Sequence, residues 1–103
     1  IKEIIIPAEC NGIPVKEIGS YAFAYIFYGD PSFAVEKIVI SDSVVKISNS
    51  AFYNCVNLKE INIPDSVTSI GEYAFYKCSS LTVINIPNSI TSIGNNALKT
   101  ARR

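Results

Sequence analysis

The sequence contains no histidine, no tryptophan and no methionine, and only three of its 103 residues are cysteine. Without histidine the chain lacks the most frequent general base and the most frequent transition-metal ligand of proteins. Nine basic residues balance nine acidic ones. This zero net charge argues against nucleic acid or an anionic membrane as a partner, because both are bound largely by opposite charge. Three cysteines are too few and odd in number for a disulfide scaffold.

Long apolar runs are also missing, since no stretch approaches the roughly 20 residues that cross a bilayer. We therefore predict no membrane insertion. Hydrophobic residues nevertheless make up 49% of the chain, and its length suits one small folded domain. The chain begins at Ile1 instead of methionine. We expect it to be a fragment of a longer array.

An internal repeat organises almost the whole sequence. Rows of 23 residues follow one another without a gap over 35–57, 58–80 and 81–103. The segment 1–34 fits the same columns once two insertions are allowed, one of five residues before Val15 and one of six residues after Phe23. The sequence therefore predicts a single domain, 1–103, made of the repeats 1–34, 35–57, 58–80 and 81–103.

Each row opens with alternating apolar residues, many of them β-branched, which predict a short half-buried strand. A turn with a short polar pair follows, and its serine is expected to bond nearby backbone. The buried strand positions are Ile4, Ile38, Ile61 and Ile84, with Ile6, Ile40, Ile63 and Ile86 two residues later.

The second half of each row predicts an extended return, a corner and a short helical turn. Gly19, Gly71 and Gly94 mark the corner, where we expect a positive φ or a close backbone approach. The helical turn would begin at an Ala-Phe pair such as Ala51-Phe52. No row can bury its own apolar face, so the rows are expected to stack into a solenoid of four coils.

Charges alternate in sign from row to row in two neighbouring columns. A parallel stack in sequence order would place every charge opposite its counter-charge, as cross-strand pairing prefers. The columns read Lys2, Glu36, Lys59 and Glu3, Lys37, Glu60.

These columns resemble the BspA-like class of leucine-rich repeats. The resemblance rests on the runs IPDSVTSIGEYAFYKCSSL from Ile63 and IPNSITSIGNNAL from Ile86, and on the opening IPAECNGIPVKEIGSYAF. Residues 24–34 and the replacement of Phe by Leu98 depart from the pattern. The resemblance implies an α/β repeat solenoid of right-handed coils, with a short parallel sheet on the concave face. It also implies a secreted or cell-surface parent protein, and adhesion or host-protein binding as its role.

Two surfaces are candidates for protein binding. The first is the outward side of the predicted sheet, although a solvated face without a ligand is the plainer interpretation. It comprises Glu3, Ile5, Lys37, Val39, Glu60, Asn62, Val83 and Asn85. The second is the aromatic insertion with Tyr25, Phe27 and Tyr28, which could equally cap the apolar core at the end of the stack. Tyr53 and Tyr76, one repeat apart, are expected to stack on the surface.

Cys55 and Cys78 occupy one column in adjacent rows, so a disulfide or a two-ligand metal site is conceivable. The plainer interpretation is that both are small buried residues. Cys10, in the first insertion, is the expected exposed thiol. Zinc would need about four ligands, and no CxxC motif is present. We predict no catalytic residue, no cofactor, no metal and no enzymatic activity.

The predicted function is a protein–protein interaction or adhesion module that binds by its concave sheet and flanking loops. The alternative is a structural spacer with no ligand of its own. The expected partner is a protein, including a host extracellular protein, and not nucleic acid. The last row has no polar cap, so its apolar end is also expected to fray or to associate end to end with a second copy.

Overall fold

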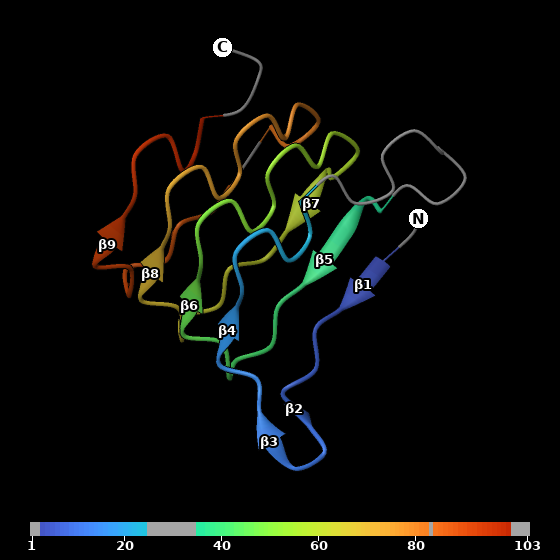
Figure 1. Ribbon diagram of the computed structural model, residues 1–103, viewed down its shortest axis with the longest axis vertical. Helices are drawn as coiled ribbons and strands as arrows, with labels where there is room; N and C mark the ends of the chain where they lie inside the picture. The colour runs from blue at the N-terminus through green and yellow to red at the C-terminus, as the bar shows by residue number, and fades with distance from the viewer. Residues whose placement is uncertain (1–2, 25–34, 83, 100–103) are drawn as a thin grey trace.

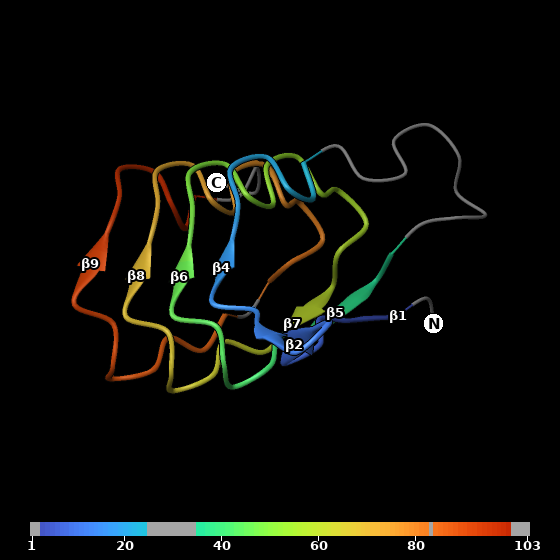
Figure 2. The ribbon, with the colours of Figure 1, turned by 60° about the horizontal axis from the view of Figure 1, so that its bottom comes forward.

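The computed structural model describes residues 3–24, 35–82 and 84–99, which wind into a stack of similar coils (Figure 1). No helix occurs in these ranges. Two parallel sheets run along the stack and are joined by turns (Figure 2). The strands are β1 (Glu3–Ile5), β2 (Glu9–Cys10), β3 (Ile13–Pro14), β4 (Glu17–Ile18), β5 (Lys37–Val39), β6 (Lys46–Ile47), β7 (Glu60–Ile61), β8 (Ser69–Ile70) and β9 (Ser92–Ile93).

The first sheet contains the predicted opening strands in the order β1-β5-β7, all parallel. Its register pairs Ile4 with Ile38 and Ile38 with Ile61, so equivalent columns of successive rows face each other. Stacking in sequence order is therefore confirmed for these rows. In the last row, Ile84 and Ile86 are half-buried against the core but do not belong to a strand.

The second sheet is formed by the extended returns in the order β4-β6-β8-β9, with one strand from each row. Its buried column contains Ile18, Ile47 and Ile70. The first insertion forms a separate antiparallel hairpin of β2 and β3 (Figure 1). Asn11 and Gly12 have φ values of 52° and 82°, as a tight two-residue hairpin turn requires.

The core lies between the two sheets and contains a continuous stack of phenylalanine rings. The ring centroids are 5.4 Å apart for Phe23 and Phe52 and 5.2 Å apart for Phe52 and Phe75, and the planes are nearly parallel. Phe52 and Phe75 are fully buried. Leu98 takes the same column in the last row and is 37% exposed, so the aromatic stack does not extend into that row.

Side-chain hydrogen bonds join each coil to the one before it. The turn serines were expected to bond nearby backbone, but their hydroxyls donate to carbonyls of the preceding coil instead. Column stacking brings that carbonyl within reach, so the hydroxyls join neighbouring coils. These bonds are Ser43 to Val15 (2.7 Å), Ser66 to Val44 (2.7 Å) and Ser89 to Val67 (2.8 Å).

Asn62 joins two coils in a different way. Its side-chain Oδ1 accepts the backbone N–H of Ile40 at 2.7 Å, and its Nδ2 donates to the Ile40 carbonyl at 3.1 Å. The Asn62 side chain thereby satisfies both the N–H and the C=O of the buried residue Ile40. Between the first two coils, the equivalent N–H group, that of Ile6, donates instead to the backbone carbonyl of Val39.

The corners differ from the sequence prediction. Gly71 and Gly94 do lie against the preceding coil, as a close approach requires, but neither they nor Gly19 has a positive φ. Positive φ occurs two residues later in every row, at non-glycine residues. The predicted helical turn is accordingly a succession of tight turns. The left-handed column comprises Tyr21 (59°), Ser50 (58°), Tyr73 (58°) and Asn96 (59°).

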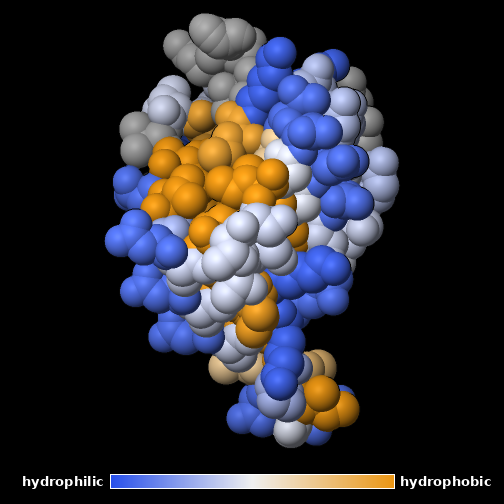
Figure 3. Space-filling view, turned by 90° about the vertical axis from the view of Figure 1, so that its left-hand side faces the viewer, coloured by the Kyte–Doolittle hydropathy of each residue, from blue (hydrophilic) through white to orange (hydrophobic). Residues whose placement is uncertain are grey.

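The face of the stack at β9 is apolar (Figure 3). Ile93 is 47% exposed, whereas Ile47 and Ile70 in the same column are buried. Ile93 and Leu98, together with the half-buried Ile84, Ile86 and Ile90, therefore form the expected apolar end.

Gly71→Ala is predicted to destabilise the fold, with Gly19→Ala as the matched control. A Cβ at Gly71 would lie 2.5 Å from the backbone nitrogen of Asn49, whereas a Cβ at Gly19 meets nothing within 4 Å. Because such overpacking typically costs about 1–3 kcal/mol, urea denaturation should show this loss for Gly71→Ala only. Equal stability of the two variants would contradict the close approach.

Asn62→Ala is predicted to cost about 1–3 kcal/mol, because it leaves the buried N–H and C=O of Ile40 without partners. The control is Asn85→Ala in the same column. Among the residues that the structure describes, the exposed Asn85 side chain has no hydrogen-bond partner, so its replacement should stay within about 0.5 kcal/mol of the parent. Thermal or urea unfolding measures both, and an equal effect would refute the bridging role of Asn62.

Candidate functional site

The outer side of the β1-β5-β7 sheet, called here the sheet face, gathers most of the predicted binding residues. Strand alternation points Glu3, Lys37 and Glu60 outward in one column, and the register places them opposite one another. Two residues along the strands, Ile5 pairs with Val39. Ile5 is 67% exposed and Val39 is half-buried. The sheet face therefore presents a charged row beside an aliphatic pair of one exposed and one half-buried side chain.

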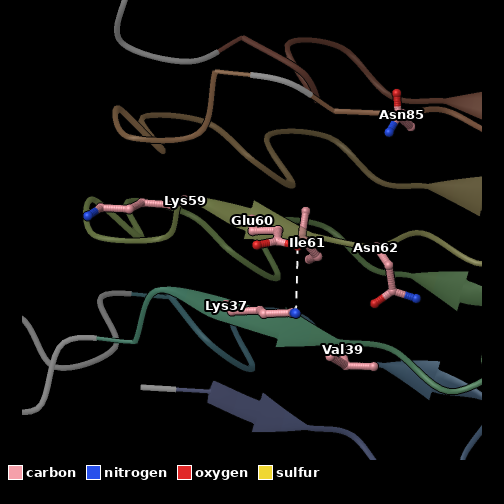
Figure 4. A pocket seen from close by; sticks show the side chains of 7 residues that line it. All are labelled: Lys37, Val39, Lys59, Glu60, Ile61, Asn62 and Asn85. Carbon is pink, nitrogen blue, oxygen red and sulfur yellow. Dashed lines mark ion pairs between the residues drawn. The ribbon is translucent and has the colours of Figure 1, made fainter. Parts of the chain in front are cut away.

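The charged row is paired in part within the protein. Lys37 Nζ lies 3.7 Å from Glu60 Oε2 (Figure 4), and in the neighbouring column Lys59 Nζ lies 3.8 Å from Glu36 Oε2. Each alternating column thus forms one of its expected pairs between adjacent coils, whereas Glu3 lies opposite Lys37 without an ion pair among the described residues, and Lys2 lies outside them. Exposed pairs of this kind contribute roughly 0–1 kcal/mol each, so they add little stability. Because the charges of these two pairs cancel locally, the pairs add little to the attraction of a charged ligand.

A shallow hollow of about 430 Å³ lies between the second, third and fourth rows of this face. Figure 4 shows the side chains that line it. Of the predicted binding residues, five meet here, and Glu3 and Ile5 do not line it. Its lining is Lys37, Val39, Lys59, Glu60, Ile61, Asn62 and Asn85.

The structure divides the predicted residues further. Asn62 is exposed, but its amide is already bonded to the Ile40 backbone, so it is not available to a ligand without breaking the coil contact. Asn85 lines the hollow and has no such bond among the described residues. Val83 and the aromatic insertion with Tyr25, Phe27 and Tyr28 lie outside the described residues.

The cysteine column has a packing role, as the plainer interpretation held. Cys55 and Cys78 are buried and form no disulfide, and Cys10 is exposed. Each buried thiol donates to the carbonyl of a phenylalanine in the preceding coil, Cys55 to Phe23 at 3.0 Å and Cys78 to Phe52 at 3.1 Å. The hydrogen bond with Cys55 lowers the pKa of the Cys78 thiol, against the increase that burial alone would cause.

The described part of the chain holds no group of three or more side chains suited to a metal ion. It also forms no helix with the length and apolar character that crossing a membrane requires.

The sequence reasoning missed a second hollow, called here the tyrosine hollow. It lies on the turns that follow β4, β6 and β8, and shares no lining residue with the hollow on the sheet face. The expected stacking of Tyr53 on Tyr76 is confirmed within it, at 5.6 Å between centroids. The signal that could have revealed it is the recurrence of tyrosine two residues after the corner glycine, at Tyr21 and Tyr73. The lining comprises Tyr21, Ser50, Tyr53, Tyr73, Tyr76 and Lys77.

Solved structures similar to this chain are bacterial leucine-rich repeat proteins. One is the leucine-rich repeat protein of T. pallidum, with 31% identity and a TM-score of 0.80 over 91% of this chain and 41% of that protein. A leucine-rich repeat protein from Bacteroides ovatus has 35% identity and a TM-score of 0.81 over 95% of this chain and 25% of its own.

A third, from Faecalibacterium prausnitzii, is described as a leucine-rich cell surface protein. It has 36% identity and a TM-score of 0.80, over 94% of this chain and 26% of that protein. This chain therefore spans a quarter to two fifths of the length of these relatives. Comparison with curated protein sequences finds no significant match.

The family model for the BspA-type leucine-rich repeat region, with six copies, matches residues 16–102. This range includes two complete rows, all but the last residue of the final row, and the return of the first. Together with the parallel, in-register stack and the three solved relatives, it establishes that the chain belongs to the BspA-type leucine-rich repeat family.

Proposed function

We propose that this chain is a protein-interaction module of a cell-surface or secreted protein and binds its partner through the sheet face. The observation that carries the proposal is the aliphatic pair of the exposed Ile5 and the half-buried Val39, which lies beside a charged row in which Lys37 already pairs with Glu60. Membership of a family whose repeat regions generally act as protein–protein interaction modules supports it. The F. prausnitzii relative, described as a cell surface protein, supports the location.

The sheet face suits binding because it is formed before any partner arrives. Backbone hydrogen bonds between parallel strands fix the positions of the outward side chains. A preformed surface loses little conformational entropy on association. A protein partner with an apolar centre and a mixed-charge rim, such as a host extracellular protein, would match the aliphatic pair and the adjacent charges.

We propose no catalytic role. The family and the three solved relatives are described as leucine-rich repeat proteins, which supports a binding role.

Two other roles are favoured by specific observations. A spacer without a ligand is favoured by the Asn62 amide and the lysine–glutamate pairs, because these groups are occupied by neighbouring coils. Self-association is favoured by the apolar end with Ile93 and Leu98. Analytical ultracentrifugation of the chain and of Ile93→Ser separates self-association from the other roles.

The double variant Ile5→Ser/Val39→Ser tests the proposal against an array of immobilised extracellular-matrix proteins. Loss of two aliphatic contacts should weaken binding to any captured protein at least about tenfold, since removing buried apolar contacts costs about 1.5–3 kcal/mol per side chain. The control is Ile13→Ser, because Ile13 is comparably exposed but lies on the hairpin. Unchanged affinity of the double variant, or no binding by the parent chain, would leave the spacer as the function.

A further inference from the structure

The tyrosine hollow is a second surface whose shape follows from the repeat. Tyr21, Ser50 and Tyr73 occupy one column in three successive coils and share the same left-handed backbone conformation. Backbone bonds hold the column in register, from Tyr21 N–H to the Asn49 carbonyl and from Ser50 N–H to the Glu72 carbonyl. In this column, the two outer coils therefore carry a tyrosine and the coil between them carries a serine.

The spacing between these two tyrosines is set by the stack. Neighbouring coils lie about 4.8 Å apart, so the backbones of Tyr21 and Tyr73 are roughly 9–10 Å apart along the stack. Ser50 has a short side chain that is buried, so it forms part of the floor of the opening between them. Tyr21, 62% exposed, forms one side of this opening and the partly exposed Tyr73 forms the other.

The ring faces at the floor of the hollow are used within the protein. Tyr76 stacks on Tyr53, receives Tyr73 edge-on at 5.1 Å, and has the Lys77 ammonium 5.7 Å from its ring centroid. A ligand therefore meets the exposed Tyr21 ring, tyrosine hydroxyl groups and the Lys77 ammonium. These groups favour a ligand that accepts hydrogen bonds and packs against aromatic side chains.

A proline-rich segment in the polyproline II conformation has these properties. It has about three residues per turn and rises about 3.1 Å per residue, so it repeats every ~9.3 Å, close to the spacing of two coils. Its carbonyls make no internal hydrogen bonds, so tyrosine hydroxyls can donate to them. Aromatic grooves bind such segments at low entropic cost because the conformation is preformed.

We infer that the tyrosine hollow binds a proline-rich segment in the polyproline II conformation, lying along the stack with one turn between Tyr21 and Tyr73 and an acidic end towards Lys77. This interaction is separate from the one proposed for the sheet face, because the two hollows share no lining residue.

The test uses a fluorescently labelled oligoproline peptide with an aspartate at one end, titrated with the whole chain and followed by fluorescence anisotropy. The parent chain should bind saturably. Tyr21→Ala and Tyr73→Ala should each weaken binding about tenfold or more, as loss of an aromatic anchor does. Because Tyr21 is mostly exposed, Tyr21→Ala remains informative even if Tyr73→Ala lowers the stability of the fold.

Ser50→Tyr fills the gap between the two tyrosines. Tyrosine already adopts this backbone conformation in the coils on either side, so the variant should fold, as far-UV circular dichroism would show, and should no longer bind the peptide. Ile5→Ser on the sheet face should bind like the parent chain.

Three results would overturn the inference. They are no binding of the peptide by the parent chain, unchanged binding by Tyr21→Ala and Ser50→Tyr, and saturable binding of a pyranose oligosaccharide in place of the peptide. None of them bears on the sheet face, whose own test depends on Ile5 and Val39.

Discussion

In-register stacking of like columns is the constraint on which the rest of this structure depends. A single row of 23 residues has two short strands and no interior, so its apolar columns become buried only between neighbouring rows. The same stacking places Ser66 under the Val44 carbonyl and Phe75 on Phe52. Stability is therefore distributed along the stack, and each coil depends on the coils beside it.

Much of the fold could be predicted from the aligned repeats, because the same residue types recur at the same positions of successive rows. The strand positions, the order of stacking and the pairing of Lys37 with Glu60 follow from periodicity and alternating charge. The left-handed column was missed because φ depends on how the chain passes over the next coil, and Tyr73 is not a residue type that favours this conformation. The bond from Ser43 to Val15 was missed because a turn serine has local partners as well as a distant one.

The candidate site was predicted in part. Outward alternation correctly places Ile5 and Val39 side by side on the sheet. The same pattern could not show that the Asn62 amide replaces a strand partner for Ile40, because an exposed asparagine on a ligand-binding face has the same sequence signature. The Asn62 amide and the two lysine–glutamate pairs are occupied by neighbouring coils, so the surfaces proposed for binding are the aliphatic pair and the tyrosine hollow.

Native-state hydrogen exchange of the dilute monomer tests the dependence of each coil on its neighbours most directly. The Gly71 N–H donates to the Ile47 carbonyl and the Gly94 N–H donates to the Ile70 carbonyl, both at 2.8 Å. Their geometry is matched, but Gly71 lies in a coil with neighbours on both sides and Gly94 lies at the apolar end. We predict much slower exchange at Gly71 than at Gly94. Equal protection of the two amides would contradict stabilisation by neighbouring coils.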